Sequence, residues 1–244
     1  MRIAFVADMH GNAIGLDAVV ADLERDDVDE VVSLGDVAQG GPQPAEVVDR
    51  LRALGWRCVF GNSDELLLTF DLGAEEVDAA EAARIVDVLT WSAEQLGPER
   101  LDFLHAFEPT ITLDVEGRTV VCCHATPTSN EEVIVPETPA ENLEQALGSA
   151  DVVACGHVHR QWLARVGPSL WFCAGSAGLV YDHRRMDDAQ PFEPWAEYAV
   201  LTATDDRFGV EFRRVEFDAS SVAAATRASG MPHAEDFARK WRTA

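Results

Sequence analysis

Five short segments of the sequence place metal-ligand side chains directly after an apolar run. The segments read "RIAFVADMH", "VVSLGD", "CVFGN", "VVCCH" and "VVACGHVH". Carboxylate and amide oxygens and imidazole nitrogens all coordinate divalent cations. The candidate metal ligands are Asp8, His10, Asp36, Asn62, His124, His157 and His159. Seven such groups exceed the needs of one ion and suit two ions that share a carboxylate.

The apolar runs in the first quarter of the chain alternate with helical patterns. Strands are predicted over 2–8, 30–36 and 56–62, and helices over 15–26 and 44–55, which indicates a parallel sheet with helical crossovers. The carboxyl ends of parallel strands meet at one edge, so the ligand-type residues should converge there. Taken singly, each has an ordinary interpretation, such as an Asp that caps a helix. The repetition of one pattern over five segments favours a metal site.

The later part of the chain changes to antiparallel patterns. Helices are predicted over 74–96 and 98–107, a hairpin turns at Glu116-Gly117, and a late hairpin turns at Asp205-Asp206. The order of elements predicts an α/β protein, a four-layer α-β-β-α sandwich of two mixed sheets flanked by helices, with a helical cap insertion. We expect a single domain over 1–244. Its additions are a helical insertion at about 71–107, a loop insertion at about 182–195 and a C-terminal helical tail at about 219–244.

The composition excludes several classes of protein. The chain has 244 residues and a formal net charge of −24, so its surface should repel nucleic-acid backbones. No apolar run approaches the length of a membrane span, and the N-terminus becomes charged too early for a signal peptide. The five cysteines lie in apolar, strand-like stretches, which argues against a disulfide framework. We therefore expect a soluble cytoplasmic protein with no membrane partner. Its oligomeric state is left open.

The order of the ligand-type segments resembles a known family. D-x-H, G-D, G-N, H and G-H-x-H, in this order, are similar to the signature of the calcineurin-like metallophosphoesterase superfamily. The stretches "HGNAIGLDAVVADL", "GDVAQGGPQPAEVV" and "CAGSAGL" look like its bacterial and archaeal phosphodiesterase-type branch. The resemblance runs from Met1 to about Leu179.

The resemblance implies a dinuclear metal centre, with manganese, iron, zinc or nickel as the two divalent ions. One ion would be held by Asp8, His10, Asp36 and His159. The other would be held by Asp36, Asn62, His124 and His157, so that Asp36 bridges. A metal-bridging hydroxide would then attack phosphorus. Residues His10, Asp36, Asn62 and His124 are the candidate catalytic residues, and the substrate would be a small-molecule phosphate ester.

Ser63 departs from the pattern of the family. In several members the segment reads G-N-H-[ED], where the His is held by the acid and protonates the leaving oxygen. A serine hydroxyl is a poor acid at neutral pH, which favours substrates whose leaving groups are already weak bases. Asp64 and Glu65 are interpreted as first-turn acids of the next helix, favourable at its positive end.

The candidate substrate-binding residues are Ser63, Arg160, Ser176, His183 and Arg184. Each also has an ordinary interpretation, as a strand cap, a turn or an exposed polar loop. The sequence favours hydrolysis of phosphodiester bonds in a small or nucleotide-like substrate. The alternatives are a phosphomonoesterase or a dinucleoside polyphosphate hydrolase. A non-catalytic scaffold on the same fold is disfavoured because the ligand set is complete.

Overall fold

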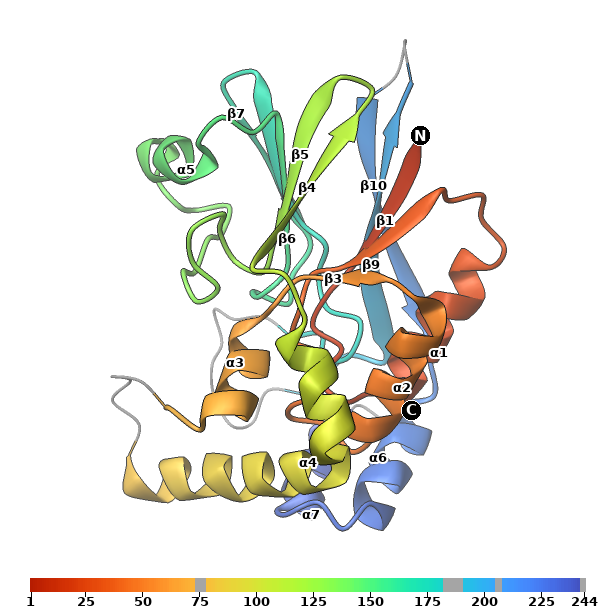
Figure 1. The fold of residues 1–244 in the computed structure, drawn as a ribbon. Helices are drawn as coiled ribbons and strands as arrows, with labels where there is room; N and C mark the ends of the chain where they lie inside the picture. Colours follow the sequence, from red (N-terminus) through yellow and green to blue (C-terminus); the bar gives the residue numbers. More distant parts are fainter. Residues whose placement is uncertain (73–77, 182–190, 205–207, 242–244) are drawn as a thin grey trace.

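Two five-stranded sheets pack face to face in the computed structural model, which describes residues 1–72, 78–181, 191–204 and 208–241 (Figure 1). The strand order is β10-β9-β1-β2-β3 in the first sheet and β4-β5-β6-β8-β7 in the second. Parallel and antiparallel pairs occur in both sheets. The predicted α/β sandwich of two mixed sheets flanked by helices is therefore confirmed.

The first sheet is built from both ends of the chain. Its strands are β1 (Arg2–Val6), β2 (Glu30–Ser33), β3 (Arg57–Cys58), β9 (Trp195–Ala203) and β10 (Phe208–Glu216). The first three are parallel and are linked by α1 (Ala13–Leu23) and α2 (Pro44–Leu54), whereas β9 and β10 run antiparallel to their neighbours. This gives the predicted succession of parallel units followed by a late hairpin, whose turn at 205–207 lies outside the described residues.

The second sheet comes from the middle of the chain. Its strands are β4 (Thr110–Val115), β5 (Arg118–Cys123), β6 (Val152–Cys155), β7 (Trp162–Val166) and β8 (Ser169–Cys173). The β4–β5 hairpin turns at Glu116-Gly117 as predicted, and β5, β6 and β8 are parallel. Helix α5 (Ala140–Leu147), which was not predicted, packs Leu143 and Leu147 into the core on the outer face of this sheet.

The alternation of side chains along β1 shows how the layers are joined. Ile3 and Phe5 belong to the apolar cluster between the two sheets, whereas Ala4 and Val6 pack under the helices on the outer face. All four are fully buried. Phe5 meets Phe172 of the second sheet edge-on, with ring centroids 5.4 Å apart. The period-two pattern thus assigns each residue of β1 to one face, and burial on both faces shows that the strand lies inside the layered structure.

Helices α3 (Asn62–Thr69), α4 (Ala79–His105), α6 (Ala219–Ala228) and α7 (Ala234–Arg239) gather at one end of the sheets (Figure 1). The two helices predicted over 74–96 and 98–107 form the single element α4, broken at Gly97 by a φ of 64° just before Pro98. Arg84 of α4 pairs with Asp236 of α7 at 3.0 Å. The division of the chain into one domain with insertions stays a prediction.

The predicted third strand is shorter than expected. β3 covers only Arg57–Cys58, and α3 begins at Asn62, directly after the turn at Gly61. At this turn Gly61 passes close to the Asp36 carboxylate. Among the described helices, none combines the length and apolar character needed to cross a membrane.

Candidate metal centre

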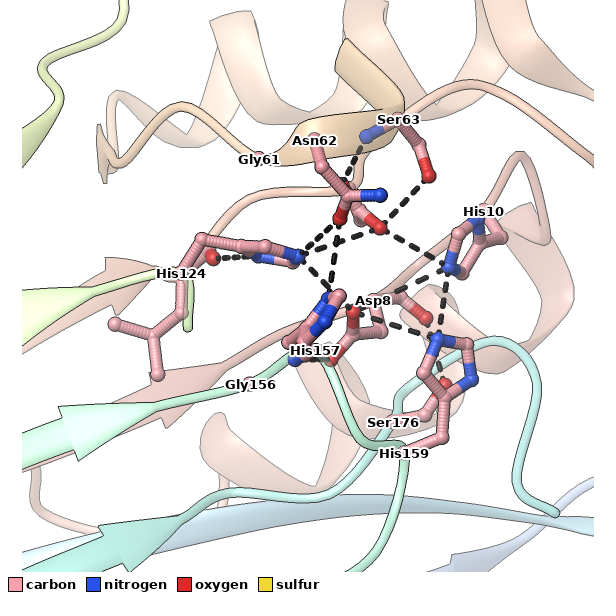
Figure 2. Close-up of polar contacts among 12 residues, drawn as sticks. Asp8, His10, Gly61, Asn62, Ser63, His124, Gly156, His157, His159 and Ser176 are labelled. Carbon is pink, nitrogen blue, oxygen red and sulfur yellow. Dashed lines mark hydrogen bonds and ion pairs between the residues drawn. The ribbon is translucent and has the colours of Figure 1, made fainter. Parts of the chain in front are cut away.

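All seven candidate ligands converge at the carboxyl ends of the strands, between the two sheets (Figure 2). Asp8 and His10 follow β1, Asp36 follows β2, and Asn62 opens α3. From the second sheet, His124 follows β5, and His157 and His159 follow β6. The sequence-based expectation that these residues lie together agrees with this placement.

Four of the residues form a first cluster, consisting of Asp8, His10, Asp36 and His159. One ligand atom from each lies within 4.8 Å of the others, and all four residues are buried. His10 Nε2 lies 3.5 Å from Asp36 Oδ2, and His159 Nε2 lies 3.5 Å from Asp8 Oδ1. Two carboxylates and two imidazoles so arranged can hold one divalent cation.

A second cluster forms on the other side of Asp36, from Asp36, Asn62, His124 and His157. Asn62 Oδ1 lies 2.9 Å from His124 Nε2 and 3.1 Å from His157 Nδ1. His124 Nε2 is also 3.4 Å from Asp36 Oδ2. Asp36 therefore contacts both clusters, as a bridging carboxylate must. His124 is buried, whereas Asn62 and His157 are partly exposed.

Backbone carbonyls orient all four imidazoles. A carbonyl oxygen only accepts hydrogen bonds, so the ring nitrogen that faces it carries the hydrogen. The other ring nitrogen then points into the centre, an arrangement typical of histidine metal ligands. The pairs are His10 Nδ1 with Gln39 O at 2.8 Å, His124 Nδ1 with Leu34 O at 2.7 Å, His157 Nε2 with Glu131 O at 3.1 Å and His159 Nδ1 with Leu179 O at 2.5 Å.

The first cluster fits a bound cation on its own geometry. The Nε2 atoms of His10 and His159 are only 3.0 Å apart, and in both rings the hydrogen sits on Nδ1. When both rings are neutral, two lone pairs therefore face each other. Asp8 Oδ1, close by, is buried and has no hydrogen-bond partner in the described part of the chain. A cation among these three atoms would satisfy all of them at once.

The backbone at the centre is held in a costly conformation. Five of the seven residues have φ between 44° and 69°, in the left-handed region that non-glycine residues avoid: Asp8, His10, Asp36, His157 and His159. Each such residue costs about 1–2 kcal/mol. Strain of this kind persists only where surrounding contacts impose it, which is common at functional sites.

Two glycines make room for the carboxylates. A Cβ on Gly61 would overlap the Asp36 carboxylate, and a Cβ on Gly156 would overlap the Asp8 carboxylate. The "GN" and "GH" pairs of the sequence therefore have a steric reason, because only glycine lets these two turns approach the acids.

The charges at the centre are strongly coupled. Burial alone would lower the pKa of His124, but the Asp36 and Asp8 carboxylates raise it to about 10. Burial would raise the pKa of Asp36, but His124, His10 and His157 together outweigh burial and hold that pKa well below its usual range. Burial raises the pKa of Asp8 and lowers the pKa of His10. Buried carboxylates that depend on a nearby positive charge are the groups that a divalent cation stabilises most.

Ser63 and Asp64 lie under the centre. The Ser63 hydroxyl donates to Asp36 Oδ2 and the Ser63 backbone N–H donates to Asp36 Oδ1, both at 2.8 Å. Glu65 and Asp64 both stand in the first turn of α3, as expected, but Asp64 does more than act as a helix acid. Its side chain is fully buried and accepts from backbone N–H groups of Asp36, Val37 and Gly61.

The remaining substrate-binding candidates lie in different surroundings. Ser176 is fully buried and donates its hydroxyl to Asp8 O at 2.7 Å, so it supports the backbone of a candidate ligand instead of facing a substrate. Arg160 Nη1 lies 3.9 Å from Glu137 Oε1. His183 and Arg184 fall outside the described residues.

The two-sheet fold and the order of the candidate ligands along the chain match those of one superfamily. The model of the calcineurin-like phosphoesterase superfamily domain matches residues 1–204. The chain belongs to this superfamily, as the motifs indicated.

Several known proteins are similar to the chain over nearly its whole length. An uncharacterized protein of Methanocaldococcus jannaschii, MJ0912, is 27% identical over 224 residues, which is 88% of each chain. A crystal structure of a metallophosphoesterase from Sphaerobacter thermophilus is 25% identical with a TM-score of 0.72, covering 97% of this chain and 96% of the other. The hypothetical protein PH1004 of Pyrococcus horikoshii OT3 shares the fold, with a TM-score of 0.81, 17% identity and 97% coverage of both chains.

Proposed function

We propose that the protein hydrolyses phosphodiester bonds of a small or nucleotide-like substrate with the help of two divalent metal ions. The observation that carries this proposal is the convergence of two clusters on Asp36, with the Nε2 lone pairs of His10 and His159 directed at each other. A purely structural network would avoid such an arrangement, because facing acceptors repel each other.

The first cluster would hold one ion and the second cluster the other, with Asp36 shared. Oxygen and nitrogen donors are mixed in both, so the residues fit manganese, iron, zinc or nickel without selecting among them. When bound, such ions activate a water molecule as nucleophile and offset the negative charge of the phosphate.

The chain's own residues fix the geometry of that reaction. The carbonyls of Gln39, Leu34, Leu179 and Glu131 set the direction of each imidazole. Ser63 fixes both oxygens of Asp36. Asn62 and His157 are the partly exposed members, so a phosphate ester would approach on their side.

The surroundings of Ser63 support a substrate with a weakly basic leaving group. The Ser63 hydroxyl is committed to Asp36, and the residue is only 8% exposed, so it offers no proton to a leaving oxygen. Aryl or phosphoryl leaving groups need that proton least. Dinucleoside polyphosphates are therefore the second candidate substrates, on the same observation, whereas simple alkyl monoesters fit poorly.

The test is a substrate panel with the metal-reconstituted protein. Rates would be compared for bis-p-nitrophenyl phosphate, p-nitrophenyl phosphate, cyclic nucleotides and dinucleoside polyphosphates, with and without a chelator. We expect chelator-sensitive hydrolysis, fastest for the aryl diester or the polyphosphate. A protein purified identically with Asp36→Asn controls for contaminating hydrolases. Metal-loaded protein that cleaves none of the panel, or that prefers the monoester p-nitrophenyl phosphate to every diester and polyphosphate, would contradict the proposal.

A further inference from the structure

Asp64 is a fully buried carboxylate that plays no part in the chemistry described so far. Its Oδ2 accepts from the backbone N–H of Asp36 at 2.9 Å and of Gly61 at 3.1 Å, and its Oδ1 accepts from the N–H of Val37 at 2.9 Å. One buried side chain therefore holds three backbone N–H groups.

The three donors belong to two separate segments. Asp36 and Val37 lie in the loop after β2, and Gly61 lies at the start of α3. The first segment carries Asp36, which both clusters share, and the second carries Asn62 of the second cluster. The Asp64 side chain therefore ties the backbone that supports one candidate ligand to the backbone that supports another.

The loop after β2 needs such a partner. Asp36 has a φ of 54° and Gly35 a φ of 94°, so this stretch follows neither helix nor strand geometry. Buried backbone N–H groups must be paired, and in an irregular loop only a side chain or water can do it. Asp64 pairs two consecutive N–H groups there, which restrains the direction in which the Asp36 side chain leaves the backbone.

A carboxylate suits this position better than an amide. All three partners are donors, so both Asp64 oxygens must accept. An asparagine would present an NH₂ group to at least one backbone N–H, leaving a buried donor facing a donor. The bond from the Gly61 N–H alone would make Asp64 an ordinary cap of α3. A cap does not require the two further bonds, from the N–H groups of Asp36 and Val37 in the loop after β2.

We propose that Asp64 is a positioning residue that sets the separation of Asp36 and Asn62 and thereby the geometry of the second cluster. The inference rests on the proposed function of the centre, because it assumes that both residues are metal ligands. It assigns no contact between Asp64 and substrate.

The experiment compares Asp64→Asn with wild type in three measurements. Metal affinity, measured by competition with a chelator, should weaken by about 10- to 100-fold, the range usual for residues that orient ligands. The absorption spectrum of the cobalt-substituted protein should change, because ligand geometry changes. In hydrolysis of bis-p-nitrophenyl phosphate, kcat should fall while KM stays within about twofold, since Asp64 does not touch substrate.

Asp78→Asn is the matched control. Asp78 also accepts two backbone N–H groups, from Ala80 and Glu81, but at the start of α4, away from both clusters. Both bonds go to Asp78 Oδ1, and an asparagine oxygen can accept them equally well, so this variant should leave thermal stability, metal affinity, cobalt spectrum and kcat unchanged.

A folded Asp64→Asn protein with wild-type metal affinity, spectrum and kcat overturns the inference. If that variant does not fold, amide hydrogen exchange in the wild-type protein decides: the N–H groups of Asp36 and Val37 should be strongly protected, and rapid exchange at both overturns the inference. Because this protection requires no metal or substrate, it separates failure of the Asp64 inference from failure of the proposed function.

Discussion

The two clusters that share Asp36 differ in how far solvent reaches them. In the first, Asp8, His10 and His159 are 0%, 6% and 4% exposed. In the second, Asn62 and His157 are partly exposed, and among the residues that it does not share with the first only His124 is buried to the same degree. In Figure 2, the second cluster spreads from His124 across Asn62 and His157, while His10 and His159 face each other on the opposite side.

The hydrogen bonds that orient His159 in the first cluster and His157 in the second also differ: the bond of His159 is buried, and the bond of His157 is exposed. His159 is fixed by the Leu179 carbonyl, and the ring of Tyr181 packs against it with centroids 4.6 Å apart. His157 instead contacts the carbonyl of Glu131, which lies in a surface turn. An exposed hydrogen bond from Asn130 to Glu65 connects this turn to α3. The comparison teaches that the first cluster is preorganised by the core, whereas the second depends on a surface turn. An ion in the second cluster should therefore exchange faster than one in the first. Mutations near the second cluster should also lower metal affinity in smaller steps than mutations in the first.

Asp36→Asn should have the largest effect, because it strikes both clusters at once. A neutral amide compensates the repulsion between two cations less well, so we expect kcat to fall about 10³-fold or more, a change of several kcal/mol in the barrier. Asp49→Asn is the control, since Asp49 is a half-exposed partner of Arg100 on the surface. Near wild-type turnover with both metals bound would show that Asp36 does not bridge.

His159→Ala and His157→Ala should separate the two clusters. Each should reduce bound metal from two ions to about one and lower activity about 10²-fold, less than Asp36→Asn, because the shared carboxylate remains. Only His159→Ala, which opens a hole in the buried cluster, should also destabilise the metal-free protein, by about 1–3 kcal/mol. Elemental analysis and thermal unfolding measure both effects. Equal destabilisation by the two variants would contradict the contrast between a buried and an open cluster.

Ser63→Ala should lower kcat less than the substitutions above, because it affects Asp36 only indirectly. It removes the hydroxyl that fixes Asp36 Oδ2, so we expect kcat to fall about tenfold. The loss should be the same for aryl and alkyl esters, because Ser63 donates no proton to the leaving group. Rates across a series of leaving groups give the measurement. A slope that steepens in the variant would show that Ser63 does act as an acid.

The seven candidate ligands could be picked out from the sequence because the pattern they follow is local. Each segment shows an apolar run followed by a metal-ligand residue, and parallel strands bring their carboxyl ends to one edge. The glycines at 61 and 156 belong to the G-N and G-H pairs of these segments, and the structure supplies the steric reason for them. The two-sheet architecture followed from the change from parallel units to hairpins near residue 110, which is also a property of short stretches.

The groups that position the candidate ligands could not be predicted from the sequence, because tertiary contacts bring them together. Backbone carbonyls such as those of Gln39 and Glu131 carry no residue signature at all. Asp64 has the sequence context of a helix cap, yet its side chain reaches back to a loop 27 residues away in the chain. Ser176 lies in a turn that resembles a pocket lining, but its hydroxyl points inward to Asp8. In each case the position of one element relative to another decides the role.

Asn130→Ala should give the smallest effect and tests the second cluster alone. The lost bond from Asn130 Nδ2 to Glu65 Oε2, 2.8 Å long and exposed, is worth about 0.5 kcal/mol, which corresponds to about a twofold change in affinity. Because the turn it anchors carries the carbonyl that orients His157, one of the two ions should bind about twofold more weakly and dissociate faster, while the other is unaffected. Asn142→Ala, on the exposed face of α5, is the matched control. Metal titration calorimetry and the rate of ion release to a chelator measure the difference. Weakening of both ions to the same extent would mean that the turn supports the whole centre, and that the two clusters are not held separately.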